Sequence, residues 1–254
     1  MIRKSRRGFI LGVPALLSLP WSLQSLAHAS DHEKIKELLA SKDRYRWLFT
    51  GDSITMGAKH THGYRSYSEI FHERLQWELG RSWDIVINTG MSGHTTQHIL
   101  EDFDWRVAQF NPSVISLMMG TNDAAKDRIS PTDFKINLQS LITKFRDLGA
   151  IPILHTPNPI IVEKAPERKN LPEYIPAIKS IAEEEQVILV DNYAHWQKNM
   201  QERSIKEIHR EWLNDPLHPN GKGHQQIARE MFRTLDIYDP NAATCGGDYY
   251  EGEH

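Results

Sequence analysis

The stretch YRWLFTGDSIT at residues 45–55 joins an apolar run of strand length to a short turn that carries Ser53. Four more apolar runs of this kind follow along the chain, and helical patterns separate them. This alternation predicts an α/β fold in which helices cover both faces of a parallel sheet. We expect the strands at residues 45–50, 84–88, 114–119, 151–155 and 187–190. Their nearly continuous apolar residues are typical of strands that are buried on both faces.

Helical patterns lie between these strands, at residues 67–79, 96–109, 131–148, 172–185 and 192–203, and a closing helix is expected near 223–235. In the third of them Pro131 indicates the start and Gly149 the stop. One apolar face of that helix predicts core packing, and it consists of Phe134, Leu138, Leu141, Ile142 and Phe145. A charged lead-in helix is expected at residues 30–42. We therefore predict one domain over residues 30–238, followed by a flexible acidic tail at 239–254.

Residues 1–29 have the parts of a removable export signal: a basic start, an uncharged stretch and a small-residue site at Ala29. The twin arginines Arg6 and Arg7 resemble the twin-arginine signal of bacteria. A retained membrane anchor is the alternative, because the uncharged run approaches the roughly 20 residues that a spanning helix needs. Pro14 and Pro20 dilute that run. We expect cleavage after Ala29, no stable membrane insertion, and a periplasmic or secreted protein.

Charge and cysteine content limit the partners of the chain. Removal of residues 1–29 takes away four basic residues and no acidic ones, so the formal net charge moves from -3 to -7. The charge disfavours a nucleic-acid partner, which would need a concentrated basic face. The single cysteine, Cys245, lies in the predicted tail and cannot form an intramolecular disulfide. No pattern indicates an oligomeric state.

Four short blocks carry the chemistry-bearing residues: GDSIT at 51–55, NTGMSG at 88–93, GTND at 120–123 and DPLHPN at 215–220. Three of them follow predicted strands, and in open parallel sheets ligands bind beyond the carboxyl ends of the strands. The fourth block lies just before the closing helix. Together they supply a serine, amide donors, a histidine and a carboxylate, which is the set that acyl transfer requires.

The order and intervals of these blocks resemble those of the SGNH hydrolases, also called the GDSL esterase/lipase family, over residues 45–235. The resemblance implies a flavodoxin-like three-layer α/β/α sandwich with a five-stranded parallel sheet, and ester hydrolysis without a cofactor or metal. It implies that Ser53 is the nucleophile and that Asp215 and His218 complete a catalytic triad. It also implies oxyanion contacts from Asn122 and from a glycine of the second block.

Elementary chemistry supports these assignments. A serine hydroxyl needs a base to take its proton, and His218 can supply one if a carboxylate such as Asp215 accepts its Nδ1 proton. Asp191 is an alternative carboxylate for that role. The Ser53 backbone N–H and the Asn122 amide are candidate oxyanion donors.

For the third oxyanion donor we favour Gly93 over Gly90. Gly93 lies next to the predicted helix start at Thr95 and Thr96, where unpaired backbone N–H groups point outward. Asp52, which follows Gly51, is assigned to bracing the loop, with no catalytic role.

The loop after Ser53 offers polar and aromatic side chains for substrate binding, and these are His60, His62, Tyr64 and Arg65. Such groups around an open site favour a hydrophilic, ring-bearing substrate over a long acyl chain. Combined with export, they favour an esterase that removes O-acetyl groups from a carbohydrate. A lysophospholipase or thioesterase of the same family is the nearest alternative.

Two further alternatives belong to other classes of protein. The His60/His62 pair is able to bind zinc if His94, His155 or Asp191 supplies a third ligand, which would give a metal-dependent hydrolase. That reading leaves the Asp215/His218 block unexplained. A carbohydrate-binding module without catalysis is the other alternative, because a fold does not determine function. Competent residue types at every predicted catalytic position argue against it.

Overall fold

The computed structural model describes residues 29–125 and 129–248. The predicted export signal falls almost wholly outside these residues, since only Ala29 is described. Across the described ranges, every helix is too short or too polar to cross a bilayer.

A parallel sheet of five strands forms the centre of the described residues, in the order β2-β1-β3-β4-β5. The strands are β1 (Arg46–Gly51), β2 (Ile85–Asn88), β3 (Val114–Met118), β4 (Ile151–Thr156) and β5 (Ile188–Asp191). Each predicted strand is confirmed, with ends that differ by at most one residue. The strand order is that of flavodoxin-like folds. The register pairs Gly51 with Met118 and Thr156 with Asp191, so the carboxyl ends of these strands meet along one edge.

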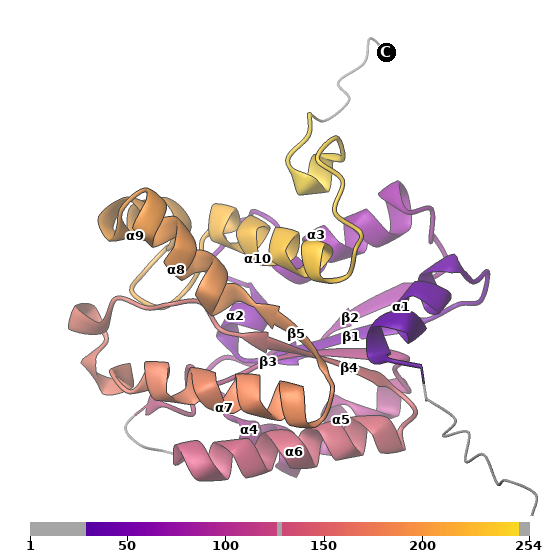
Figure 1. The fold of residues 1–254 in the computed structure, drawn as a ribbon, viewed down its shortest axis with the longest axis horizontal. Coiled ribbons are helices and arrows are strands. Elements are labelled where there is room, and N and C mark those ends of the chain that lie inside the picture. Colours follow the sequence, from indigo (N-terminus) through magenta and orange to yellow (C-terminus); the bar gives the residue numbers. More distant parts are fainter. Residues whose placement is uncertain (1–28, 126–128, 249–254) are drawn as a thin grey trace, which may run out of the picture.

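Helices cover both faces of the sheet, which confirms the three-layer sandwich (Figure 1). One face carries α1 (Asp31–Ala40), α3 (Tyr67–Glu73) and α10 (Gly221–Thr234). The opposite face carries α4 (Thr96–Glu101), α5 (Phe103–Arg106), α6 (Pro131–Asp147) and α7 (Leu171–Glu184). The short α2 (Ser53–Met56) follows β1, and α8 (Asn192–Glu202) packs against α9 (Ile205–Trp212) beside α10.

The core lies between the sheet and each helical layer. On the α6 side the strand residues Leu48, Ile115 and Leu154 pack in one cluster with the helices. All five residues of the predicted apolar face of α6 are buried there, as expected: Phe134, Leu138, Leu141, Ile142 and Phe145. On the α10 side Trp47 and Phe49 pack with Phe71, and the ring centroids of Phe49 and Phe71 are 5.2 Å apart.

Two predicted helices are interrupted. The helix expected at 67–79 becomes a π-helical turn (Arg74–Glu78) after α3, in which the Arg74 guanidinium donates from Nε to the Ile237 carbonyl oxygen at 3.0 Å. The helix expected at 96–109 divides into α4, α5 and a 3₁₀ turn (Ala108–Phe110). Within it Arg106 turns inward to the sheet. In both cases a buried arginine that binds backbone carbonyl groups accompanies the loss of regular helix.

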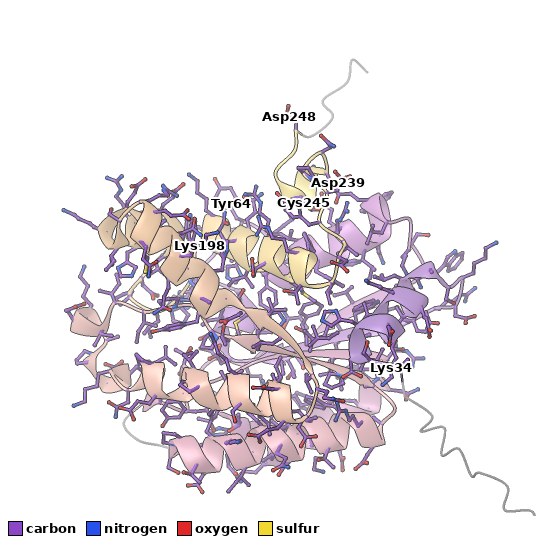
Figure 2. The ribbon with its side chains drawn as sticks, in the orientation of Figure 1. Lys34, Tyr64, Lys198, Asp239, Cys245 and Asp248 are labelled. Atoms are coloured by element: carbon purple, nitrogen blue, oxygen red, sulfur yellow. The ribbon has the colours of Figure 1, made fainter. Side chains whose placement is uncertain are left out.

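The sequence prediction missed α9 and misjudged the C-terminal segment. Ser204 caps α9 by accepting from the Glu207 N–H at 3.2 Å, and Ile208 and Trp212 pack against Trp196 of α8. Residues 239–248 pack on the domain rather than forming the predicted flexible tail (Figure 2). The Thr244 N–H donates to Glu78 Oε1 at 3.0 Å, and Cys245 is 2% exposed. Cys245 is therefore a core residue.

Arg106 links the carboxyl ends of two strands although it is fully buried. Its Nε donates to the Thr89 carbonyl at 3.0 Å and its Nη2 to the Gly51 carbonyl. Its Nη1 lies 3.1 Å from Nδ1 of His94. Burial lowers the pKa of Arg106 to about 10, which still leaves it charged at neutral pH.

We expect the substitution Arg106→Met to destabilise the fold, because it removes the side-chain donor to the Thr89 carbonyl and one of two donors to the Gly51 carbonyl, which also accepts from the Met91 N–H at 3.0 Å. The expected loss in the free energy of unfolding is roughly 1–3 kcal/mol, the cost of one unsatisfied carbonyl. Urea titration measures it. Arg233→Met is the matched control, since Arg233 forms an exposed ion pair with Glu230 and should lose less than about 1 kcal/mol. Equal losses in the two variants would contradict this role of Arg106.

Two buried histidines make the stability depend on pH. Burial lowers the pKa of His155 and of His224 to about 3, so both are neutral in the folded protein. In the unfolded chain a histidine takes up a proton below about pH 6.5. Stability is therefore lost as the pH falls below that value. Asp52 has the opposite effect on the pH dependence of stability, because burial raises its pKa to about 7.

Substitution of His155 isolates its contribution to the pH dependence of stability. We expect His155→Gln to flatten the dependence of the unfolding free energy on pH, between about pH 4 and 6, by about 1.4 kcal/mol per pH unit. The exposed His32, changed in the same way, is the control and should leave the slope unchanged. Urea unfolding at a series of pH values measures both slopes. An unchanged slope in His155→Gln would show that His155 titrates normally in the folded state.

Candidate active site

Ser53 lies at the carboxyl edge of the sheet because the chain turns sharply from β1 into α2. Gly51 permits this turn, since a Cβ at that position would lie 2.6 Å from the Met118 carbonyl oxygen and 2.2 Å from Thr55 Oγ1. Asp52 caps α2 by accepting from the Ile54 N–H at 2.9 Å. The Ser53 side chain is then placed at the first position of the helix, 8% exposed.

Asp215 and His218 occupy a tight loop between α9 and α10. The loop is closed by a backbone bond from the Asn214 N–H to the His218 carbonyl at 2.8 Å and by an antiparallel bridge between Leu213 and Pro219. Asp215 Oδ1 accepts from the N–H groups of Leu217 and His218, both at 2.9 Å. Helix α9, which the sequence pattern did not predict, leads directly into this loop. The bonds within the loop fix the spacing of the Asp215 and His218 side chains.

The structure brings Ser53, His218 and Asp215 into one chain of hydrogen bonds. Ser53 Oγ lies 2.8 Å from His218 Nε2, and His218 Nδ1 lies 2.9 Å from both carboxylate oxygens of Asp215. A carboxylate only accepts, so it selects the Nδ1–H tautomer and leaves the Nε2 lone pair facing the Ser53 hydroxyl. This arrangement can remove a proton from Ser53 as the hydroxyl attacks an acyl carbon.

The carboxylate of Asp215 stays ionised in this setting. Burial raises its pKa, but the N–H groups of Leu217 and His218 and the His218 imidazole outweigh that effect and hold the pKa below its ordinary value. The alternative partner, Asp191, lies elsewhere. It caps α8, accepts from Thr156 Oγ1 at 3.0 Å and pairs with Lys179 at 2.5 Å.

Asn122 lies beside this chain with its amide orientation set by neighbours. Its Nδ2 donates to Asp52 Oδ2 at 3.3 Å and to the His94 carbonyl at 3.2 Å. Its Oδ1 accepts from Arg168 Nη2 at 3.1 Å. Both Nδ2 bonds are long, so an oxyanion of substrate can replace one of them. Burial raises the pKa of Asp52 to about 7, and Asp123 adds to the effect, while the Ile54 N–H and the guanidinium groups of Arg168 and Arg106 oppose it.

The two candidate glycines of the second block have different surroundings. The Gly90 N–H donates to Asn88 Oδ1 at 2.9 Å, and a Cβ on Gly90 would lie 2.4 Å from the Met56 nitrogen. Gly90 is therefore committed to packing against α2. Gly93 has a φ of +80°, and no atom lies within 4 Å of the position of a Cβ there. Its surroundings suit close approach of a substrate, in line with the preference for Gly93.

The four predicted substrate-binding residues separate into two groups. His60 stacks on His218, with ring centroids 3.6 Å apart and an interplanar angle of 4°. The other three line a cavity of about 770 Å³ between the loop at 57–66, α9 and the start of α10. In it His62 bonds to Asn214, Arg65 pairs with Glu73, and Tyr64 is 73% exposed (Figure 2). A larger cavity, of about 1180 Å³, lies at the amino-terminal edge of the sheet, away from Ser53.

The geometry does not support a metal site built on the His60/His62 pair. His155 lies in the core against Ser116, and His94 lies against Arg106, so neither faces the pair. Among the described residues, the group of three side chains close enough to share a metal ion is His60, Asp215 and His218. The lone pair of an imidazole nitrogen lies in the plane of its ring, and no point lies in the planes of two stacked parallel rings. His60 instead lies on the face of the His218 ring, with its Nδ1 3.2 Å from Asp215 Oδ2.

Several residues around the site were not singled out in the sequence. Arg168 binds Asn122 from the loop after β4. Asn214 lies between the two histidines of the 57–66 loop, with Nδ2 3.3 Å from His60 Nδ1. A lone arginine or asparagine in a loop carries no periodic signal.

The comparisons with known proteins agree with this geometry. Residues 49–226 match the model of the GDSL-like Lipase/Acylhydrolase family. The chain is similar to an acetylxylan esterase from Geobacillus stearothermophilus, with 29% identity over 74% of this chain and 92% of that protein. In structure it is similar to a catalytic mutant of Axe2, an acetylxylan esterase from the same organism, with a TM-score of 0.64 and 25% identity over 75% of this chain and 94% of that one.

A second solved structure shares the fold. An alpha/beta hydrolase enzyme from the metagenome of Lake Arreo, Spain, superposes with a TM-score of 0.65 at 22% identity, covering 76% of this chain and 95% of that one. The family match spans the turn that carries Ser53 and the loop that carries Asp215 and His218. With its five-stranded parallel sheet and this arrangement at the carboxyl edge, the chain belongs to the GDSL-like lipase/acylhydrolase family, the SGNH hydrolases.

Proposed function

We propose that this protein is an exported serine esterase that removes O-acetyl groups from a carbohydrate, with acetylated xylan or its oligosaccharides as the first candidate substrate. The observation that carries the proposal is the unbroken chain of hydrogen bonds from Ser53 Oγ through His218 to Asp215. The similarity to acetylxylan esterases, which extends over three quarters of the chain, supports the choice of substrate class.

In the first step Ser53 Oγ attacks the carbonyl carbon of the acetyl group, and His218 Nε2 takes the Ser53 proton. Asp215 stabilises the imidazolium that forms and holds its ring in place. When the tetrahedral intermediate collapses, the bond from the acyl carbon to the sugar oxygen breaks. His218 returns the proton to that oxygen, so the sugar leaves as an alcohol and Ser53 is acetylated.

The negative oxygen of the intermediate needs donors that are aimed at it in advance. We assign these to the Ser53 N–H, the Gly93 N–H and the Asn122 amide. Loss of one such donor commonly costs about 2.7–4 kcal/mol of transition-state stabilisation. Asp52, His94 and Arg168 hold the Asn122 amide in place, and the oxyanion would replace one of the two long bonds that its Nδ2 makes.

In the second step water replaces the sugar. His218 takes a proton from the water as its oxygen attacks the acetylated Ser53, and a second tetrahedral intermediate forms. Its collapse breaks the bond between the acyl carbon and Ser53 Oγ, His218 returns the proton to Ser53, and acetate leaves. Each residue thus ends the cycle in its starting state, with no cofactor consumed.

The loop at 57–66, which follows the helix of Ser53, supports a polar, ring-bearing alcohol. His62, Tyr64 and Arg65 line the open cavity of about 770 Å³ with aromatic and charged groups. An exposed tyrosine offers a flat face to a sugar ring, and the charged groups offer hydrogen bonds to its hydroxyls. The basic, uncharged and small-residue regions of residues 1–29 support export, which would bring the enzyme to extracellular polysaccharide.

The serine mechanism predicts the behaviour of one variant and one reagent. Ser53→Ala should abolish the hydrolysis of small acetyl esters such as 4-nitrophenyl acetate, because no nucleophile remains, while the melting temperature should stay near that of the wild type. A chelator should leave the wild-type activity intact. Initial rates and thermal melting measure both effects. Chelator-sensitive turnover that survives in Ser53→Ala would instead support a metal-dependent hydrolase.

The acetyl preference predicts a trend along an acyl series. Esters of 4-nitrophenol should be hydrolysed with kcat/KM falling from acetyl to octanoyl, and acetate should be released from acetylated xylan. Faster turnover of the octanoyl ester would support a lysophospholipase or thioesterase type. Tight binding of xylan without release of acetate, and without turnover of any acetyl ester, would support the non-catalytic module.

A further inference from the structure

The imidazole of His94 lies beside the proposed oxyanion donors, and the mechanism above gives this ring no role. His94 follows Gly93 directly, and its carbonyl oxygen accepts from Asn122 Nδ2 at 3.2 Å. Its ring Nδ1 lies 3.1 Å from Nη1 of the buried Arg106, which also binds the Gly51 carbonyl at the end of β1. The His94 ring is therefore held against the loops that follow β1 and β3.

Arg106 fixes the tautomer of the His94 ring. A guanidinium group has only donors, so the His94 Nδ1 accepts this bond with its lone pair. The proton of the neutral ring then lies on Nε2. The two nitrogen atoms of an imidazole point away from each other, so a ring whose Nδ1 faces the buried Arg106 turns its Nε2–H outward. The ring is half-buried, and no described residue pairs with this Nε2.

The surroundings keep His94 neutral and its ring in place. Burial lowers the pKa of His94, and the positive charges of Arg106 and His98 lower it further, whereas Asp102 raises it. The His98 ring lies against that of His94, with centroids 4.7 Å apart. His98 is itself held by the Thr95 N–H, which donates to its Nδ1 at 3.1 Å. His94 thus presents one N–H donor in a fixed direction.

The chemistry of an acetyl ester limits what this donor can bind. The acyl side of such an ester carries one polar atom, the carbonyl oxygen, and three donors are already assigned to it. The other oxygen atoms of the substrate belong to the alcohol. A sugar offers several hydroxyl and ring oxygens that accept a hydrogen bond, whereas a simple aryl ester offers none beyond the ester oxygen. A few fixed polar groups of this kind are what orients a ligand in its site.

We propose that His94 is a specificity-determining residue of this site, whose Nε2–H donates to an oxygen atom of the acetylated sugar. The proposal rests on the proposed esterase function, because it concerns the alcohol side of that substrate. His94 does not line the cavity of about 770 Å³ that Tyr64 and Arg65 line. It therefore recognises the sugar that carries the acetyl group, next to the oxyanion donors, independently of that cavity.

Two substitutions in the full chain separate the outward donor from the inward contact with Arg106. His94→Asn keeps an oxygen acceptor near the position of Nδ1 but has no atom at that of Nε2. We compare kcat/KM for an acetylated xylo-oligosaccharide with kcat/KM for 4-nitrophenyl acetate. The ratio of the two should fall roughly 2- to 13-fold in His94→Asn, because one neutral hydrogen bond to the sugar is lost.

His94→Gln tests the opposite case, since it keeps an N–H donor near the position of Nε2 but withdraws the acceptor from Arg106. Its ratio should stay near that of the wild type, while its melting temperature should fall. The exposed His32, changed to Asn, is the matched control and should keep the wild-type ratio. Equal losses on both esters in His94→Asn, an unchanged ratio, or an equal fall of the ratio in His94→Gln would each overturn the proposal.

NMR of the His94 side-chain nitrogens makes the test independent of turnover. At neutral pH Nε2 should carry the proton and Nδ1 should not, and xylo-oligosaccharide without acetyl groups should shift the Nε2–H signal. If the wild type hydrolyses no acetyl ester, the proposed function fails, and this titration still decides whether His94 binds a sugar. A proton on Nδ1, or an Nε2–H signal that high concentrations of oligosaccharide leave unmoved, overturns the proposal whether or not the enzyme is active.

Discussion

Two buried side chains, Arg106 and Asp123, join the three loops that follow the first three strands. Arg106 binds the Gly51 and Thr89 carbonyls and contacts His94. Asp123 accepts from the Thr96 N–H at 2.8 Å and from the Gly120 N–H at 3.1 Å. A buried polar group is costly unless its hydrogen bonds are made, so any shift of one loop would leave such a group unsatisfied. The loops consequently keep one relative position, and Ser53, Gly93 and Asn122 depend on it.

Asp215 has a comparable role in the loop before α10. Its carboxylate faces the N–H groups of Leu217 and His218 and the Nδ1 atoms of His218 and His60. The loop itself is tied to the segment after β4, where the Ile161 N–H donates to the Pro216 carbonyl at 2.9 Å. The N–H groups of Leu217 and His218 and the His218 imidazole explain why its pKa stays low although burial opposes ionisation. An ionised and fixed Asp215 is what a preset imidazole base requires.

Much of the fold and the central part of the site were predictable because their signals are local. Each strand is a short apolar run, and the Ser53, Asn122 and Asp215/His218 blocks are short strings whose residues lie close in sequence. The contacts that complete the site are different. His60 meets Asp215 and Arg168 meets Asn122 across long stretches of chain, and the inward turn of Arg106 breaks the helix that periodicity predicted. Such contacts depend on tertiary packing, which residue patterns do not encode.

The elements that hold Ser53 and Asn122 differ from those that line the cavity of about 770 Å³. Ser53 and Asn122 follow central strands, where buried hydrogen bonds fix the backbone. Tyr64 and Arg65 lie on a surface loop, and α9 contributes exposed charges such as Arg210 to the same cavity. Changes on this outer rim cost little stability, because the ion pairs there are solvent-exposed. The chain shares its fold with solved structures at about 22–25% identity. This agrees with the division, since the sheet and its carboxyl edge can persist while the residues that line the cavity change. Ser53 and Asn122 are thus tied to the core of the fold, and the lining of the cavity is tied to its surface.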